Sequence, residues 1–317
     1  MVRIAGETLH VHFLGTAGAL PSPQRNPSCI LIRRGSDTLL FDCGEGAQQQ
    51  MMRARTGFGI DAIFVTHWHA DHFLGIFGLV ETLSFTGRTE PLHIYGPDWV
   101  REFVGLLRTV GRGNVGFPVH AHPLGHGAVV PFPGYTVRAF ATRHGIAGLG
   151  YVLEEDARPG RFDRERAIAL GVPAGPLFGR LQRGETVRVV RDGVEIEVRP
   201  SDVMGDERPG RKIVYTGDTR PLQHQPEAAA LMRDADLLIH DATFDDEDAA
   251  RAAEVLHATA GEAGEAAEAL NSRMLALVHL SSRYTGIGNH IRDAKRNYKG
   301  DVIAPADLTV LEITYRG

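Results

Sequence analysis

Side chains that could bind metals are concentrated in the segment Thr66–His72, which reads Thr-His-Trp-His-Ala-Asp-His and follows the apolar run 62–65. Side chains of an extended chain alternate between two faces, so His67, His69 and Asp71 can point the same way. Imidazole nitrogens and carboxylate oxygens are ligands that zinc and similar divalent cations accept. Because a catalytic metal keeps one position for water, three histidines and an aspartate within six positions favour two metal ions sharing one site.

Three further candidate ligands lie at or near the ends of expected strands. His144 follows the strand expected at 136–141, and Asp218 follows a strand that ends in glycine, which allows a tight turn. His279 lies in the apolar run 275–280. A single histidine of this kind more often forms a structural hydrogen bond than it binds a metal. Together with the histidine-rich loop, however, these residues would complete a two-metal site.

Expected strands and helices alternate along most of the chain, and some consecutive strands are close enough to form hairpins. Strands are expected at 9–14, 29–33, 38–41, 62–65, 91–96, 136–141, 213–217, 237–240 and 275–280, and helices at 48–55, 73–83, 98–110 and, interrupted near 257, at 247–270. This mixture favours a mixed α/β sandwich more than a doubly wound parallel sheet.

The segment 154–191 breaks the regular alternation. It contains Pro-Gly, Val-Pro and Gly-Pro pairs, and between Arg158 and Arg191 it has eight arginines against three acidic residues. Long irregular segments in compact domains are usually either functional or disordered. We interpret 154–191 as a basic arm inserted in a single domain that spans 1–317. A solvated surface excursion without a binding partner is the alternative.

Composition limits the class of protein further. The chain has 317 residues, 43% of them apolar, but no run of about 18 apolar residues that could span a membrane. The first seven residues are charged where a secretory signal has its apolar stretch, so we expect a cytoplasmic protein. Cys29 and Cys43 form neither a disulfide framework nor a zinc motif. A net charge of −5 argues against a surface that coats nucleic acid generally, but it allows a local basic patch.

In its motifs the chain resembles the metallo-β-lactamase superfamily and, within it, the ribonuclease Z family, almost from end to end. Asp42 matches the first superfamily motif, and the loop 67–72 matches the HxHxDH signature. His144, the segment 217–220 (Gly-Asp-Thr-Arg) and the segment 279–284 (His-Leu-Ser-Ser-Arg-Tyr) match the following motifs in order. The resemblance implies an αβ/βα four-layer sandwich with a protruding arm, the exosite.

The resemblance also implies a metal-dependent hydrolytic centre. Two divalent ions are expected in each subunit, and zinc is favoured although manganese and iron use similar ligands. Asp71 would also be the general base. The implied ligands are His67, His69 and His144 for one ion, Asp71, His72 and His279 for the other, and Asp218 as a bridge between them.

Other residues would support these ligands. Asp42, His240 and Asp241 are expected to orient them from behind. His257 could be a structural residue within a helix or a catalytic acid. It aligns with the histidine that, in ribonuclease Z, is thought to protonate the departing oxygen, and Asp241 would orient it. Asp241 stands where the family has glutamate, and Ala258 stands where the family has serine.

The implied activity is removal of the 3′ trailer from precursor tRNA, which leaves a 3′-hydroxyl on the tRNA and a 5′-phosphate on the trailer. The arm contains a Gly-Pro pair like that of the exosite, which grips the tRNA elbow. Arg25 lies in a loop like the family's PxKxRN segment, with Pro23 in place of lysine. A homodimer is implied, in which the arm of one subunit clamps the tRNA cleaved by the other. The residues expected to contact tRNA are Arg25, Arg158, Arg161, Arg164, Arg166, Gly175, Pro176, Arg180 and Arg183.

Two alternatives belong to other functional classes. A small-molecule metallo-hydrolase of the same fold, such as a phosphodiesterase or a lactonase, would not need a basic arm with a Gly-Pro pair. A non-catalytic RNA-binding member of the superfamily would have lost metal ligands, and here each motif keeps its ligand.

Overall fold

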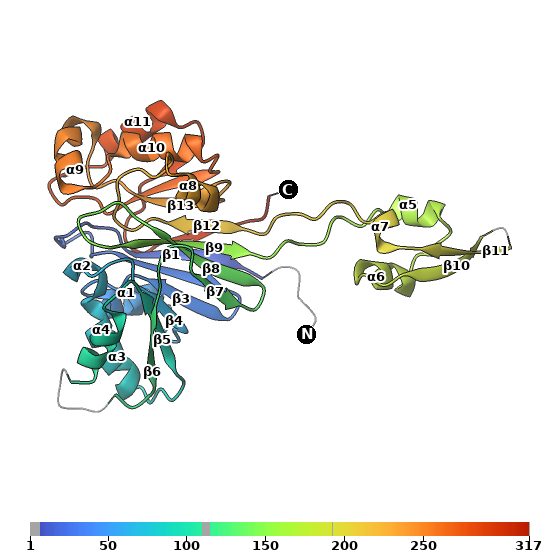
Figure 1. Ribbon diagram of the computed structural model, residues 1–317, viewed down its shortest axis with the longest axis horizontal. Helices are drawn as coiled ribbons and strands as arrows, with labels where there is room; N and C mark the ends of the chain where they lie inside the picture. Colours follow the sequence, from blue (N-terminus) through green and yellow to red (C-terminus); the bar gives the residue numbers. More distant parts are fainter. Residues whose placement is uncertain (1–6, 110–114, 192, 317) are drawn as a thin grey trace. The chain divides into compact units, whose positions relative to one another are not determined.

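The computed structural model describes residues 7–109, 115–191 and 193–316 (Figure 1). It divides into a larger unit, residues 1–154 with 211–317, and a smaller unit, residues 155–210. The smaller unit is an insertion between two paired strands, because Glu154 and Lys212 lie opposite each other in one antiparallel ladder. In the part of the chain described, no helix is both long and apolar enough to cross a membrane.

The larger unit contains two mixed sheets. The first has the order β16-β1-β2-β3-β4-β5-β6 and is parallel from β3 to β6. Its strands are β1 (Leu9–Gly15), β2 (Cys29–Arg34), β3 (Asp37–Phe41), β4 (Ala62–Phe64), β5 (Leu92–Gly96), β6 (Val119–Pro123) and β16 (Thr309–Glu312). The second has the order β15-β14-β13-β12-β9-β8-β7 and is parallel from β12 to β15. Its strands are β7 (Val129–Phe132), β8 (Tyr135–Ala141), β9 (Leu149–Glu155), β12 (Lys212–Tyr215), β13 (Leu237–Asp241), β14 (Met274–Val278) and β15 (Asp301–Ile303).

The sheets pack face to face, and helices cover their outer faces. The aromatic rings of Phe41, Phe64 and Tyr151 meet between the sheets, with ring centroids 5.1 Å apart for Phe41 and Phe64 and 5.3 Å apart for Phe64 and Tyr151. The helices α1 (Ala47–Ala54), α3 (Gly75–Phe85) and α4 (Val100–Leu107) cover the first sheet, and α8 (Pro226–Met232), α10 (Ala260–Ala269) and α11 (Gly288–Asn297) cover the second. The predicted four-layer αβ/βα sandwich is confirmed.

Parallel pairing gathers the candidate site residues at the carboxyl ends of the strands. Asp42 follows β3, and His67, three residues after the end of β4, lies at the same edge of the first sheet. In the second sheet Asp218 follows β12, Asp241 ends β13 and His279 follows β14. Asp42 and His279 have φ values of +56° and +61°, an uncommon backbone conformation for residues other than glycine. The chain therefore turns sharply where it leaves the sheets and enters the site.

Most expected elements are present, with ends shifted by one or two residues. The helix expected at 73–83 is divided at Leu74 into α2 (Ala70–Phe73) and α3. The helical stretch expected at 247–270 consists of η1 (Asp246–Asp248), α9 (Ala249–Val255) and α10, with His257 in the break. The end of the helix expected at 98–110 lies outside the described residues.

The smaller unit has a core of its own. Its two connecting segments form a ribbon in which Arg158 pairs with Arg208 and Phe162 pairs with Met204. Gly160 is needed in this ribbon, because a Cβ there would collide with the backbone of Gly205. Beyond the ribbon, α5 (Arg164–Ala169), α6 (Pro176–Gln182), α7 (Pro200–Val203) and the hairpin of β10 (Val187–Arg191) and β11 (Val194–Val198) enclose a small apolar cluster.

This compact unit differs from the arm expected at 154–191 in extent and in charge. It continues to 210, because β11 pairs with β10 and Val203 of α7 belongs to the apolar cluster. The segment expected to be irregular contains short helices and a strand. Residues 155–210 include ten arginines and eleven acidic residues. The positive charge therefore belongs to part of the unit and not to its whole surface.

Candidate metal centre

The histidine-rich loop carries its candidate ligands on two kinds of backbone. His67 and His69 lie on the extended segment after β4, and His69 directly precedes α2. Asp71 and His72 lie within α2. His67 Nε2 and His69 Nδ1 are 3.0 Å apart, and His72 Nε2 is 3.4 Å from Asp71 Oδ2. The extended segment and the helical turn thus each supply two neighbouring ligands.

Asp218 lies at the centre of the candidate ligands. Its Oδ2 is 3.2 Å from His279 Nε2 and 3.4 Å from His72 Nε2. The same oxygen is 3.7 Å from His67 Nε2 and 3.9 Å from His144 Nε2. The carboxylate therefore stands between two sets of histidines, as a bridging ligand would.

The ligand atoms form groups in which all atoms lie within 4.8 Å of one another. The first group consists of His67, His69, His144 and Asp218. The second group consists of Asp71, His72 and His279. A third group, which overlaps with the other two, consists of Asp218, His257 and His279. The structure thus gathers all seven residues that the sequence suggested as ligands, and it adds His257 to their immediate surroundings.

The chemistry of these side chains fits a divalent metal. His72 Nε2 and Asp218 Oδ1 are buried and have no hydrogen-bond partner among the residues that the structure describes. Burial lowers the pKa of His67 well below its usual value, and neighbouring His72 lowers it further, so the neutral ring offers a lone pair. Burial alone would raise the pKa of Asp71, but the neighbouring His279 and His72 rings outweigh this effect and lower the pKa below its usual value. Buried polar atoms without partners are unfavourable, and a cation at this place would satisfy them.

Asp42 holds His72 from behind. Its Oδ2 lies 2.8 Å from His72 Nδ1 and accepts a hydrogen bond of 2.7 Å from the Tyr215 hydroxyl. Its Oδ1 accepts a hydrogen bond of 2.7 Å from the backbone N–H of Thr66. The carboxylate is fully buried. With Nδ1 of His72 engaged in this way, Nε2 is directed toward the centre.

Three further rings, those of His67, His144 and His279, are oriented by hydroxyl groups and by a backbone carbonyl. Thr66 Oγ1 lies 3.0 Å from Nδ1 of His67. Thr243 Oγ1 lies 2.8 Å from Nδ1 of His279, and the carbonyl oxygen of Leu256 lies 3.1 Å from Nδ1 of His144. In each ring the nitrogen away from the centre has a partner, which fixes the direction of the other nitrogen.

His257 forms a pair with Asp241. Its Nδ1 is 2.9 Å from Asp241 Oδ2, and the other Asp241 oxygen accepts a bond of 2.7 Å from the Thr243 hydroxyl. Burial alone would lower the pKa of His257, but the Asp241 carboxylate outweighs this effect and raises it to about 9. The ring stacks on His279 with centroids 5.0 Å apart. The Asp241 carboxylate therefore favours the protonated form of the imidazole that stands beside the candidate ligands.

His240 lies elsewhere than the sequence suggested. Its Nδ1 donates a hydrogen bond of 2.7 Å to the backbone carbonyl of Asp241, and not to a candidate ligand. Leu238, two positions earlier on β13, packs against the helices, and His240 shares this face of the strand. Any influence of His240 on the metals would therefore pass through Asp241.

Arg25, expected to contact tRNA, is half-buried and joins two loops. Its Nη1 donates to Thr16 Oγ1 at 2.5 Å and to the carbonyl oxygen of Pro305 at 2.6 Å. The carboxylate of Asp307 accepts from the Thr16 hydroxyl and from the backbone N–H of Asn26, which fixes the same loop. These contacts give Arg25 a structural role, and its contact with RNA remains a prediction.

The other residues expected to contact tRNA lie in the smaller unit. Gly175 has a φ of +145° and Pro176 begins α6, so this pair also sets the start of a helix. Glu185 binds two arginines, with its Oε2 at 2.8 Å from Arg180 Nε and its Oε1 at 3.3 Å from Arg183 Nε. Arg161, Arg164, Arg166, Arg180 and Arg183 are exposed, and Arg158 is partly exposed.

Sequence reasoning missed several supporting residues. Thr66, Thr243 and Tyr215 orient ligands or their carboxylate partners. Arg220 and Glu262 form an ion pair beside the backbone of His257. Thr66 and Arg220 lie next to ligand motifs in the chain, and this position could have identified them as supporting residues. No such signal exists for Glu262, whose partner lies 42 residues away in the chain.

Comparisons with known proteins agree with this geometry. The family model of the metallo-beta-lactamase superfamily matches residues 23–260. The chain is 52% identical over 310 residues to a protein named Ribonuclease Z from Methanosarcina acetivorans, covering 97% of this chain and 99% of the relative. It is 47% identical over 309 residues to a Ribonuclease Z from Myxococcus xanthus, with 97% and 99% covered.

Solved structures give the same result. The short form of human tRNase Z has a TM-score of 0.67 and 26% identity, covering 96% of this chain and 99% of the human chain. The metallo-beta-lactamase fold protein YhfI from Bacillus subtilis has a TM-score of 0.67, and its 20% identity supports the fold alone. From the family model and the close relatives together, this chain belongs to the ribonuclease Z family of the metallo-β-lactamase superfamily.

Proposed function

We propose that the chain is a metal-dependent endoribonuclease that removes the 3′ trailer from precursor tRNA, leaving a 3′-hydroxyl on the tRNA and a 5′-phosphate on the trailer. One observation carries this proposal. Seven candidate metal ligands and the Asp241–His257 pair converge at one edge of the sandwich. They do so in a chain about half identical, over nearly its whole length, to proteins named Ribonuclease Z. With precursor tRNA as the substrate, the cytoplasm would be its place of action.

The proposed cofactor is a pair of zinc ions in each subunit. When bound, such ions supply Lewis-acid chemistry, lower the pKa of water and stabilise charge on a phosphodiester. The buried, unpartnered atoms of His72 and Asp218 support a cation at this place. The residues that would hold the ions are His67, His69 and His144 for one, Asp71, His72 and His279 for the other, and Asp218 for both.

Two side chains would move protons. The ionised Asp71 would accept a proton from the attacking water. Nδ1 of His257 contacts Asp241 and Thr243, so Nε2 is the nitrogen that would face the substrate. From there it would protonate the departing 3′ oxygen of the tRNA. A sugar alkoxide leaves poorly unless it is protonated, so this transfer matters most for the natural substrate.

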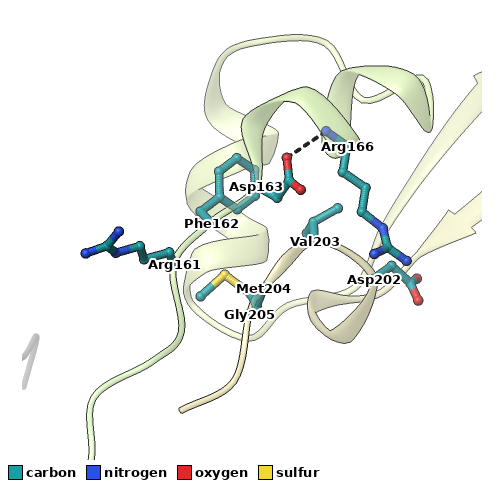
Figure 2. Close-up of a pocket in the computed structure, with 8 residues that line it drawn as sticks. All are labelled: Arg161, Phe162, Asp163, Arg166, Asp202, Val203, Met204 and Gly205. Atoms are coloured by element: carbon teal, nitrogen blue, oxygen red, sulfur yellow. Dashed lines mark hydrogen bonds between the residues drawn. The ribbon is translucent and has the colours of Figure 1, made fainter. Parts of the chain in front are cut away.

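The smaller unit would bind tRNA through local features and not through its total charge. Most of its arginines are exposed, but acidic residues balance them in number. A pocket of about 390 Å³ in this unit is lined by residues that include Phe162, Met204, Arg161 and Arg166. Figure 2 shows these side chains, with that of Arg161 extending away from the others. Aromatic rings and guanidinium groups stack on unpaired bases and bind phosphates, which fits RNA as the ligand.

A second copy of the chain is the proposed protein partner. On the larger unit, Leu74, Trp99 and Leu106 are each more than 40% exposed. Trp99 lies beside Phe73, with ring centroids 6.1 Å apart, so the exposed groups around α2 and α4 include an aromatic cluster. Exposed apolar groups of this size commonly mark an interface. Sedimentation should give a dimer, and Leu74→Asp should shift it toward the monomer.

Cleavage of a 3′-extended precursor tRNA tests the proposed function. Metal-free protein should be inactive, and zinc, manganese or iron(II) supplied singly should restore a cut that yields a 3′-hydroxyl on the tRNA. Bis(p-nitrophenyl) phosphate should be hydrolysed in parallel. Hydrolysis of the small diester with the precursor tRNA left intact would contradict the proposal and favour a small-molecule phosphodiesterase.

A further inference from the structure

Arg220 forms a clamp on the segment that carries His257. Its Nη1 donates to the carbonyl oxygen of His257 at 2.5 Å and to Glu262 Oε2 at 2.8 Å. Its Nη2 donates to Glu262 Oε1. The two side chains are 16% and 27% exposed, so solvent only partly screens the pair. Paired bonds between a guanidinium and a carboxylate fix both position and orientation.

Both partners of this clamp are anchored in turn. Glu262 Oε2 accepts a hydrogen bond of 2.9 Å from the backbone N–H of Thr259, and Thr259 Oγ1 accepts one of 3.2 Å from the N–H of Glu262. This reciprocal capping begins α10. The backbone N–H of Arg220 donates to the carbonyl oxygen of Arg143 at 2.9 Å. The clamp therefore connects α10, the turn after β12 and the loop that precedes His144.

The backbone at His257 needs such support. The preceding residue, Leu256, has a φ of +60°, a conformation that is strained for a branched side chain. The backbone N–H of His257 donates to the carbonyl oxygen of Ala252 in α9, and α10 begins at Ala260, so the chain changes direction within a few residues. A displacement of about 1 Å at a catalytic group can reduce a rate by about 100-fold. Small movements of this turn would therefore matter for proton transfer from the His257 ring.

We propose that Arg220, held by Glu262, is a positioning residue that places His257 for proton transfer to the departing 3′ oxygen. This inference rests on the proposed function. In that reaction the oxygen of water bonds to phosphorus, and the bond between phosphorus and the 3′ oxygen breaks with its electron pair on that oxygen. The 3′ oxygen takes a proton from His257 Nε2, and Asp71 takes a proton from the water. Arg220 contacts the backbone of His257 and no reacting atom.

Two substrates separate this role from a general structural one. The departing oxygen of precursor tRNA needs a proton, whereas the nitrophenolate of bis(p-nitrophenyl) phosphate leaves without one. Arg220→Gln should lower kcat on precursor tRNA by about 10- to 100-fold, with KM and the nitrophenyl rate within about twofold of wild type. Arg220→Lys and Glu262→Gln, which each keep part of the clamp, should give intermediate losses with the same substrate pattern. Bound metal should match wild type in all three variants.

Arg316 provides a matched control. It forms an ion pair of 2.8 Å with Asp236 and donates to the carbonyl oxygens of Asp234 and Ala235, near the amino-terminal end of β13. Asp241 lies at the opposite end of this strand. Arg316→Gln removes an arginine with similar bonding and should leave both substrates within about twofold of wild type.

The possible outcomes separate the inference from the function it rests on. Equal losses on both substrates, reduced metal content, or wild-type cleavage of precursor tRNA by all three clamp variants would overturn the role of Arg220 while leaving the nuclease activity established. A wild-type protein that does not cut precursor tRNA would remove the proposed function itself. A His257→Ala/Arg220→Gln double variant should be no slower than His257→Ala alone, and additive losses would overturn the inference.

Discussion

The edge of the sandwich and the smaller unit use charged side chains in opposite ways. At the edge, three carboxylates are between 0% and 3% exposed, those of Asp42, Asp218 and Asp241. Each has an oxygen between 2.8 and 3.2 Å from a histidine nitrogen. In the smaller unit, Arg183 and Arg188 are 62% and 70% exposed, and their ion pairs are long. A buried charge without a partner is strongly destabilising, so it is fixed by several neighbours, whereas an exposed charge is not.

This difference determines how strongly a substitution should act. Asp42 and Asp241 have few positions available to them, because their oxygens contact backbone, hydroxyl and imidazole groups at once. An arginine on the smaller unit can adjust its position in water. Loss of one charge should therefore be severe at the edge and mild on the smaller unit.

The largest effect is expected from Asp218→Asn. This substitution keeps the shape of the side chain but removes the charge that faces both groups of ligands. We expect loss of bound metal and a fall of at least about 1000-fold in kcat/KM on precursor tRNA. Metal analysis of the purified protein and the cleavage rate give the two measurements.

Asp236→Asn is the matched control for this experiment. Asp236 is also a buried carboxylate, but it precedes β13 and accepts from the backbone N–H of Lys212 and from Arg316. Its substitution should lower the melting temperature and leave metal content unchanged. If Asp218→Asn retained both metal and activity, burial alone and not metal binding would explain the carboxylates at the edge.

An intermediate effect is expected from Asp42→Asn. Asp42 contacts His72 and is not among the candidate metal ligands, and substitution of a ligand-orienting carboxylate typically changes metal affinity by about 10- to 100-fold. Activity should recover when more metal is supplied, which a competition titration with a chelator can quantify. Tyr215→Phe removes one hydrogen bond to the same carboxylate and should have a smaller effect. Unchanged affinity in Asp42→Asn would separate this residue from the metal centre.

The sequence predicted the ligands at the edge of the sandwich better than the extent of the smaller unit. The reason is that the former follow strands closely in the chain, whereas the latter depends on contacts between distant segments. His67, His69 and Asp71 follow a strand within a few positions, and His144, Asp218 and His279 follow or end others. Parallel pairing places the ends of β12 and β14 at one edge, which explains why Asp218 and His279 converge, whereas β8, which precedes His144, pairs antiparallel with β7. The expectation that candidate ligands follow strand ends was therefore sufficient to predict most of this convergence. The position of the break at His257 was also visible in the alanine-rich stretch.

Other contacts depend on partners distant in the chain. Arg220 meets Glu262, 42 residues away in the chain, because of how β12 and α10 pack. In the smaller unit, the run of arginines ends near Arg191, but β11 pairs with β10 and adds acidic residues. Local composition cannot show where a compact unit ends, because its end depends on which segment completes the apolar cluster.

A smaller effect is expected from Arg161→Ala and Arg166→Ala, tested singly. Both side chains line the pocket of the smaller unit (Figure 2). Each should raise KM for precursor tRNA by about two- to fivefold, reduce the salt dependence of binding by about one phosphate contact, and leave the nitrophenyl rate unchanged. Arg53→Ala, at an exposed position of α1, is the control. Equal losses in the control would mean that these arginines act only through net charge.

The smallest effect is expected from Glu185→Gln, and it has the opposite sign. Glu185 binds both Arg180 and Arg183 through side chains that are more than 40% exposed. Its replacement removes a negative charge and releases two guanidinium groups. Affinity for precursor tRNA should rise by about two- to threefold at low salt, with a steeper dependence on salt concentration. The melting temperature should stay nearly constant, because exposed ion pairs contribute little to stability. Weaker binding would instead mean that Glu185 holds the two arginines in the arrangement that RNA requires, so that this part of the smaller unit is organised like the edge of the sandwich.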